Sequence, residues 1–413
     1  MLRIKPFAAL RPRPDLVEEV VSLPYDVMDR DEARAMSNGN PHSFLHVIRS
    51  EIGLDDAVSA YDPSVYDAAR ANLARFVDEG VLEREGEERV YLYRQEAMIN
   101  GKKVSQTGVV ACCHVEDYLN NVILKHEKTR QAKEDDRTNH TLAINANPGP
   151  VFLMHEDTPG VRTLVESGSS GEPLYDMTAI DGVRHTVWRT DDASPFVETF
   201  AKIPVAYVAD GHHRSASAAR AGAERRASNP EHTGDEEYNW FLCVLFEASQ
   251  LEILGYHRVV KGLNGLDADG LIEKLKTVGT VTPVEQSEPD GTGRFHVYAA
   301  GSWHRVVIPA DSIDTSDPVA ALDYQILYDR VLAPILGIGD IRTDDRIDFV
   351  GGIRGVGELA SRVDSGRADV AFAMAPVTID QLVAVSDAGM IMSPKSTWFE
   401  PKLRSGFFVH TLD

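Results

Sequence analysis

Five consecutive residues carry the kinds of group that bind phosphate: Asp210-Gly211-His212-His213-Arg214. Glycine permits a tight turn and a close approach of the backbone to a ligand. Imidazole and guanidinium groups donate hydrogen bonds to phosphate oxygens, and a helix N-terminus adds N–H groups and partial positive charge. The pattern therefore predicts a phosphate-binding turn, in which the aspartate would hold Mg²⁺ or orient a histidine or a hydroxyl group.

Two other interpretations of this motif stay open. Asp210 can be the N-cap of a helix whose next residues are simply solvated. A zinc site has less support, because His212 and His213 are adjacent and therefore project in different directions. No Cys or His partner stands at a spacing typical of zinc ligands.

A second cluster of charged and polar residues consists of Lys125, His126, Glu127, Lys128 and Thr129. The charged form of a glutamate is favoured among cations, and a glutamate that a substrate buries can accept a hydroxyl proton. Glu127 is thus a candidate general base. Taken alone, however, the segment is more typical of a solvent-exposed run of charges.

The third cluster is Ser393-Pro394-Lys395-Ser396-Thr397. Lys395 and the hydroxyl groups of Ser396 and Thr397 can bind an anionic group. The segment is not a P-loop, because the glycine-rich run that precedes a P-loop lysine is missing. The alternative is a polar turn before a closing strand.

The elements that would position these clusters alternate between strands and helices. The β-branched and aromatic residues 205–209 predict a strand, and the alanine-rich residues 215–226 predict a helix. Asn100-Gly101 favours a two-residue type I′ turn within a hairpin. The other predicted elements are hairpin strands at 90–93 and 104–110, helices at 64–82, 135–146, 318–336, 356–363 and 379–388, a second hairpin at 295–308, and strands at 370–374 and 406–410. This alternation predicts an α/β or α+β fold with a mixed sheet.

The composition limits the class of protein. The 413 residues include 42 Lys+Arg and 64 Asp+Glu, for a net charge of −22, and 43% are hydrophobic. Such a chain can bury sizeable cores, and its acidity argues against general nucleic-acid binding. No run reaches the roughly 18–20 apolar residues of a membrane span, and the N-terminus lacks the apolar stretch of a signal peptide. We expect a cytoplasmic protein in which Cys112, Cys113 and Cys243 are reduced and structural.

Taken in order, the three clusters resemble motifs of the ADP-dependent free L-serine kinases of archaea, a family of the ParB/sulfiredoxin-like superfamily. Those kinases have a lysine followed shortly by His-Glu, then Asp-Gly-His-His-Arg, and later Ser-Pro-Lys-Thr-Thr after a glycine-containing turn. Residues 369–372 and 378–383 look like the corresponding strand and helix. Three motifs in one order are more specific than any of them alone.

The whole chain looks still more like a widespread family of bacterial proteins of unknown function that is built on this kinase-like core. The features that carry the resemblance are Pro24-Tyr25-Asp26-Val27, His126-Glu127-Lys128-Thr129, Asp210-Gly211-His212-His213-Arg214, Tyr256-His257-Arg258 and Pro394-Lys395-Ser396-Thr397. The resemblance implies an N-terminal α/β segment at 1–85, a mixed-sheet ParB/sulfiredoxin-like phosphate-binding core at 86–260, and a C-terminal α/β substrate-binding domain at 261–413. Relative to the kinases, the N-terminal segment is extra and the core has a large insertion at 130–205.

The resemblance also implies a role for each cluster in phosphoryl transfer. Glu127 would be the catalytic base, and Asp210 and His212 would assist transfer. The nucleotide phosphates would be bound by Gly211, His212, His213 and Arg214. The substrate would be held by His126, Thr129, Lys395, Ser396 and Thr397. The expected reaction converts L-serine and a nucleotide, ADP or ATP, to O-phospho-L-serine with Mg²⁺ as bridging charge, and Asp210 is the candidate metal ligand.

Three alternatives to the forward serine kinase remain. The reaction can run in reverse and make serine from phosphoserine. The protein can be a ParB-like nucleotide-dependent switch associated with DNA or a partner protein, although the sequence has no convincing helix-turn-helix and its charge is −22. A sulfiredoxin-like phosphorylation of oxidised cysteine lacks a cysteine in the Asp210 motif. A homodimer is expected only from the general frequency of such assemblies.

Overall fold

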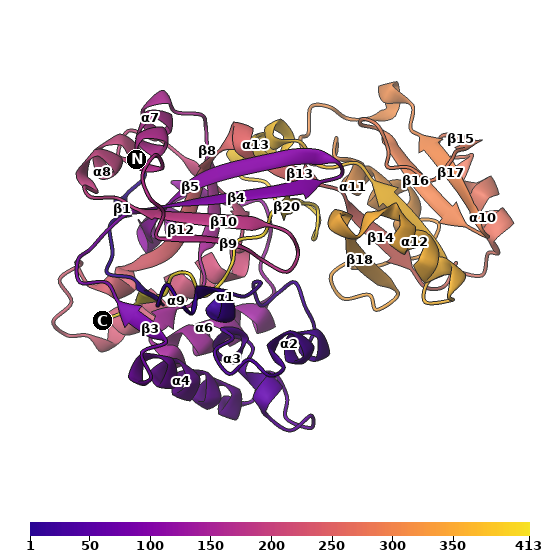
Figure 1. The fold of residues 1–413 in the computed structure, drawn as a ribbon. Helices are drawn as coiled ribbons and strands as arrows, with labels where there is room; N and C mark the ends of the chain where they lie inside the picture. The colour runs from indigo at the N-terminus through magenta and orange to yellow at the C-terminus, as the bar shows by residue number, and fades with distance from the viewer. The chain divides into compact units, whose positions relative to one another are not determined.

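A computed structural model describes residues 1–413 and divides them into two compact units (Figure 1). Unit 1 contains residues 1–125, 129–251 and 401–413, and unit 2 contains residues 126–128 and 252–400. Both units mix strands and helices, which confirms the predicted α/β class. The three-part division at residues 85 and 260 remains a prediction. No helix is both long and apolar enough to span a bilayer.

Unit 1 is built on a nine-stranded mixed sheet. In sheet order its strands are β6 (Ile123–Leu124), β11 (Ala206–Asp210), β8 (Val151–His155), β12 (Trp240–Glu247), β5 (Lys102–His114), β4 (Tyr91–Ile99), β10 (Arg184–Arg189) and β9 (Tyr175–Thr178), with β1 (Ile4–Lys5) also paired to β5. The pairs β12–β8 and β11–β6 are parallel, and the other pairs are antiparallel. The β4–β5 hairpin turns at Asn100 and Gly101, whose φ angles are 49° and 77°. Positive φ at both residues is the signature of the predicted type I′ turn.

Helices and short strand pairs surround this sheet. The helix α6 (Gln131–Ile144) packs against both α9 (His212–Ser228) and α4 (Pro63–Asp78), and Figure 1 shows the three together. The remaining helices are α1 (Val17–Val20), α2 (Arg30–Ser37), α3 (Leu45–Ile48), α5 (Val115–Leu119), α7 (Pro159–Gly168) and α8 (Ser194–Phe200). Two short antiparallel pairs complete the unit, β2 (Leu10–Pro12) with β3 (Leu82–Arg84) and β7 (Ala146–Asn147) with β21 (His410–Thr411).

The three cysteines lie buried in unit 1 and none forms a disulfide. Burial raises the pKa of the Cys112 and Cys243 thiols well above the usual value. A protonated thiol is a poor nucleophile, so these side chains act as small apolar groups.

Unit 2 is built on a six-stranded antiparallel sheet. In sheet order its strands are β15 (Thr280–Pro283), β17 (Ser302–Val307), β16 (Arg294–Ala299), β19 (Val370–Met374), β14 (Tyr256–Val260) and β18 (Ile347–Gly351). The helix α12 (Gly355–Asp364) packs on β14, β16 and β19 (Figure 1). The other elements are α10 (Ala268–Leu275), α11 (Asp323–Leu327), α13 (Ile379–Asp387) and the pair β13 (Glu252–Leu254) with β20 (Trp398–Glu400).

Two predicted elements are wrong in extent. The single helix expected at 318–336 is replaced by α11 and a π-helical turn at Tyr328–Leu332. Of the strand expected at 406–410, only His410 lies in a strand, the two-residue β21, and the left-handed φ of 94° at Gly406 interrupts an extended backbone. Phe407 and Phe408 instead enter an aromatic cluster with Tyr91 and Tyr93.

Asp323, at the start of α11, provides a test of unit 2 that does not depend on function. Burial raises the pKa of its carboxyl to about 6, although the Gly293 N–H donates a 2.6 Å hydrogen bond to it. Since the folded protein holds this proton more tightly than the unfolded chain, stability should fall as the pH rises from about 4 to about 6. We expect Asp323→Asn to remove that slope and to raise the free energy of unfolding at pH 7 by about 1–2 kcal/mol. Urea unfolding between pH 4 and 8 measures this, and an unchanged slope in the variant would contradict it.

Candidate functional site

The predicted phosphate-binding turn has the expected local structure. The strand β11 ends at Asp210, Gly211 has a left-handed φ of 96°, and α9 begins at His212. A side chain at position 211 would be strained by this φ, and its Cβ would lie 3.0 Å from Arg214 Nε. Glycine also provides no capping side chain, so the N-terminus of a 17-residue helix presents its N–H groups and positive end at this turn.

This geometry predicts a measurable cost for a side chain at Gly211. Gly211→Ala should lower the free energy of unfolding by more than about 1–2 kcal/mol, because it adds contact with Arg214 to the strain of the left-handed backbone. Gly182→Ala is the matched control, since Gly182 has a φ of 80° and a Cβ added there would have nothing within 4 Å of it. Urea unfolding compares the two variants. Equal losses would show that the contact with Arg214 contributes nothing.

Arg214 is held in a network of carbonyl and carboxylate oxygens. Its Nη1 donates to the Pro150 carbonyl, and its Nη2 lies 3.4 Å from Asp210 Oδ2. Burial alone would lower the pKa of this guanidinium, but the charges of Asp26 and Asp210 raise it above the usual value. Lys402 Nζ lies 3.5 Å from the same oxygen of Asp210. The Asp210 carboxylate therefore has two cations beside it, one of them 192 residues away in sequence.

The two histidines at the start of α9 differ in their surroundings. His212 is buried. The Nε2 of His213 accepts a 3.1 Å hydrogen bond from the backbone N–H of Arg130, which precedes α6. Beside Arg130, the Thr129 hydroxyl donates to Glu134 at 2.6 Å. Unit 1 thus brings the starts of α6 and α9 together.

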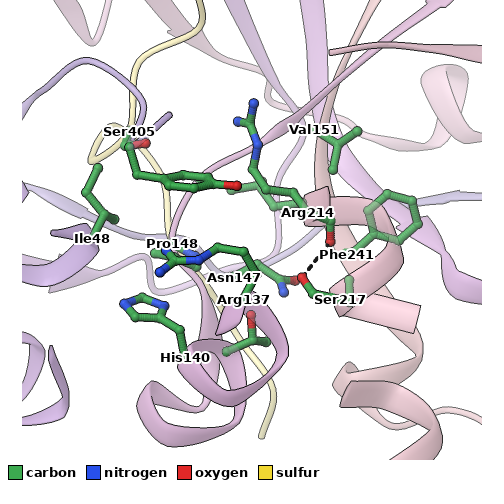
Figure 2. Close-up of a pocket in the computed structure, with 15 residues that line it drawn as sticks. Ile48, Arg137, His140, Asn147, Pro148, Val151, Arg214, Ser217, Phe241 and Ser405 are labelled. Atoms are coloured by element: carbon green, nitrogen blue, oxygen red, sulfur yellow. Dashed lines mark hydrogen bonds between the residues drawn. The ribbon is translucent and has the colours of Figure 1, made fainter. Parts of the chain in front are cut away.

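A small cavity of about 30 Å³ lies next to this turn (Figure 2). Arg214 from α9 and Arg137 and His140 from α6 line it together with Tyr25. The Arg137 guanidinium stacks 4.4 Å from the centre of the Tyr25 ring. Burial, with a further contribution from Arg137, lowers the pKa of His140 to about 3, so this imidazole is neutral. The N-terminal Pro24-Tyr25-Asp26 motif therefore belongs to the surroundings of the phosphate-binding turn.

The candidate base lies in unit 2, in the three-residue segment 126–128. The backbone N–H of Met392 donates to the His126 carbonyl at 2.8 Å, and His126 Nε2 lies 3.1 Å from Thr397 Oγ1. Glu127 and Lys128 line a cavity of about 490 Å³. The other residues that line it are Gln325, Tyr328, Gly339, Asp340, Ile341, Arg342, Ile391, Met392, Ser393 and Pro394. Residues 126–128 of the second cluster thus lie in unit 2 with the third cluster, whereas Lys125 and Thr129 belong to unit 1.

The Ser393–Thr397 loop is a tight turn with one strained residue. Lys395 has a φ of 58°, which non-glycine residues seldom adopt. Its Nζ lies 5.5 Å from the centre of the Tyr256 ring. Ser396 is buried, and its hydroxyl donates to the Ser393 carbonyl at 2.7 Å. The position of Ser396 therefore supports the loop, while its assignment to substrate binding remains a prediction.

The potential metal ligands of the chain are dispersed. No group of three or more His, Cys, Asp and Glu side chains is placed to hold an ion. Asp210 is a single carboxylate with Arg214 and Lys402 nearby. Mg²⁺ is commonly bound through one or two carboxylates together with the phosphates of a nucleotide. These residues therefore suit a metal that arrives with its nucleotide, and Asp210 as its protein ligand remains a prediction.

The structure places three further residues near the candidate sites, to which the sequence analysis assigned no role. Lys402 and Arg137 stood next to the motifs, in the charged runs that follow Thr397 and Thr129. Arg342 lines the unit 2 cavity, where it is paired with Asp340 at 2.6 Å, and no pattern in the sequence pointed to it.

The solved structures that match this chain share little sequence with it. A free serine kinase mutant in complex with AMP is 12% identical, with a TM-score of 0.37 over 73% of this chain and 92% of that chain. A conserved hypothetical protein from Pyrococcus furiosus is 14% identical, with a TM-score of 0.36 over 73% and 94%. SbnI with a C-terminal truncation, from Staphylococcus aureus, is 12% identical, with a TM-score of 0.38 over 70% and 82%.

No curated protein matches the chain. The family described as "Protein of unknown function (DUF1015)" matches residues 4–325. This match spans more than half of the 413 residues. The chain therefore belongs to the DUF1015 family.

Proposed function

We propose that this protein is a phosphotransferase that moves a phosphoryl group between a nucleotide and the hydroxyl group of a small molecule, with L-serine as the acceptor. The observation that carries the proposal is the turn at Asp210–Arg214, where a left-handed glycine precedes a long helix beside an arginine whose side chain is only 12% exposed. Such a turn combines backbone N–H groups, a helix dipole and a fork of guanidinium donors. These are the groups that bind the phosphates of a nucleotide.

The second cluster supplies the group that such a reaction needs at the hydroxyl. Glu127 lines a cavity that also exposes Lys128, so a carboxylate base and a cation lie at the same surface. In the proposed reaction Glu127 accepts the hydroxyl proton of the acceptor as the oxygen attacks the terminal phosphorus. The bond from that phosphorus to the bridging oxygen breaks, and the shortened nucleotide leaves with the electron pair.

The remaining predicted residues have binding roles in the proposal. Gly211, His212, His213 and Arg214 bind the phosphates, and His126, Thr129, Lys395, Ser396 and Thr397 bind the acceptor. The phosphate-binding residues and Thr129 lie in unit 1, and the other residues assigned to the acceptor lie in unit 2. Phosphoryl transfer depends mainly on positioning and on neutralising negative charge, which this set of cations and one carboxylate can supply.

The donor and the direction are part of the same proposal. ADP or ATP, each with Mg²⁺, would be the donor, and O-phospho-L-serine would be the product. The same groups serve the reverse reaction, in which phosphoserine gives its phosphoryl group to a nucleotide.

³¹P NMR of the purified protein with Mg²⁺ and L-serine tests the proposal. ADP, ATP and pyrophosphate are offered in parallel, and phosphoserine with AMP or ADP tests the reverse direction. A phosphoserine signal, or its loss in the reverse mixture, identifies donor and direction together. Unchanged spectra in every mixture, with nucleotide binding intact by calorimetry, would overturn the kinase assignment and favour a nucleotide-binding switch.

A further inference from the structure

The Tyr256-His257-Arg258 motif has no role in the proposed reaction, yet it contains the largest fully buried side chain of the protein. Arg258 lies on β14 and is 0% exposed. Its Nη1 donates to the Tyr256 carbonyl, and its Nη2 donates to the Pro394 carbonyl at 3.2 Å. Its guanidinium lies 4.2 Å from the centre of the Tyr324 ring and 5.3 Å from that of Phe349.

This arginine is buried without a neutralising ion pair. No carboxylate oxygen lies within 4.0 Å of it, and its Nε has no hydrogen-bond partner. Burial lowers the pKa of the guanidinium to about 10, against the opposing effects of Tyr324, Tyr256 and Glu127. At neutral pH it is therefore still charged. A buried cation without a paired carboxylate destabilises a fold, so the contacts of Arg258 must offset this cost.

Arg258 contacts a loop that lines the cavity of Glu127, which is the candidate acceptor site. Pro394, whose carbonyl accepts from Arg258, lines the same cavity as Glu127. The next residue, Lys395, has the left-handed φ of 58° and lies over the ring of Tyr256. The motif on β14 thus contacts the Ser393–Thr397 loop at two successive residues: Arg258 contacts Pro394, and Tyr256 contacts Lys395.

We propose that Arg258 is a positioning residue of the acceptor site, which fixes the Ser393–Thr397 loop, and so the wall of the cavity that Glu127 lines, through the Pro394 carbonyl. This role rests on the proposed function. Arginine suits it better than lysine, because a planar fork can donate to two carbonyls while it also contacts aromatic rings. A lysine would keep the charge but would lose one of the two hydrogen bonds and the planar contact with the rings.

Two variants and one control test the anchoring of the loop without any assay of activity. Arg258→Met removes the charge and both donors. Arg258→Lys keeps the charge, and it is the variant to measure if Arg258→Met does not fold. Arg294→Met is the control, because Arg294 pairs with Asp290 at 3.2 Å and is 40% exposed in the same unit. Hydrogen exchange of a peptide spanning residues 391–397 should be at least tenfold faster in the Arg258 variants and unchanged in the control. Unchanged exchange in both Arg258 variants would overturn the proposal.

The kinetic arm uses the transfer reaction detected by ³¹P NMR. Arg258→Lys should lower kcat about 10²-fold and leave the Kd for the nucleotide within twofold, because a displaced loop and base affect the acceptor side of the reaction. Faster exchange with an unchanged kcat would overturn the positioning role. If the wild-type protein transfers no phosphoryl group in any mixture, the proposed function fails, and the exchange data alone then report whether Arg258 anchors the loop.

Discussion

Glu127→Gln should abolish phosphoryl transfer while the protein still folds and binds nucleotide. The amide has nearly the shape of the carboxylate but cannot accept a proton from the acceptor hydroxyl. General-base catalysis contributes about 10²–10⁴-fold, so kcat should fall by at least that range. Because the proposal assigns Glu127 to the acceptor hydroxyl and not to the nucleotide phosphates, the Kd for MgADP or MgATP should change by less than twofold.

Initial rates by ³¹P NMR and nucleotide titration by calorimetry measure these two effects. Glu285→Gln is a suitable control, because it makes the same chemical change at an exposed position of unit 2. Full activity in the Glu127 variant would show that another group is the base. A loss of nucleotide binding equal to the loss of rate would place Glu127 in nucleotide binding instead.

Local rules account for the parts of the fold that the sequence predicted well. Asn100-Gly101 defines its hairpin because few residue pairs tolerate positive φ at both positions. The β11–turn–α9 unit follows from a β-branched run, a glycine and an alanine-rich segment. The helix α13 follows Thr378, whose side chain accepts a hydrogen bond from the Gln381 N–H in a capping box. In each case the information lies within a few neighbouring residues.

The contacts that build the candidate site are mostly long-range, and periodicity does not encode them. Arg258 meets Pro394 across 136 residues, and Lys402 approaches Asp210 across 192. The segment 126–128 belongs to unit 2, although the chain on either side of it belongs to unit 1. Such contacts depend on how whole elements pack. The order of motifs could therefore suggest which residues share a function, but not which of them share a unit.

Arg214→Met should weaken both the fold of unit 1 and its affinity for nucleotide. The substitution removes the hydrogen bond to the Pro150 carbonyl and the cation beside Asp210. Loss of one member of a largely buried charged pair costs several kcal/mol, and here Lys402 still compensates Asp210 in part. We expect the free energy of unfolding to fall by about 2–3 kcal/mol and the Kd for MgADP to rise about 10²-fold.

The matched control is Arg226→Met at the other end of α9, where the arginine is 45% exposed and pairs with Glu116 at 3.2 Å. It should change the free energy of unfolding by less than about 1 kcal/mol, as exposed pairs do. The double variant Asp210→Asn with Arg214→Met separates charge pairing from packing. Because its two substitutions remove one shared interaction, its loss of stability should be smaller than the sum of the single losses. Strict additivity would mean that Arg214 stabilises the turn through groups other than Asp210, such as the Pro150 carbonyl. An unchanged Kd for nucleotide in Arg214→Met would remove this arginine from the phosphate site.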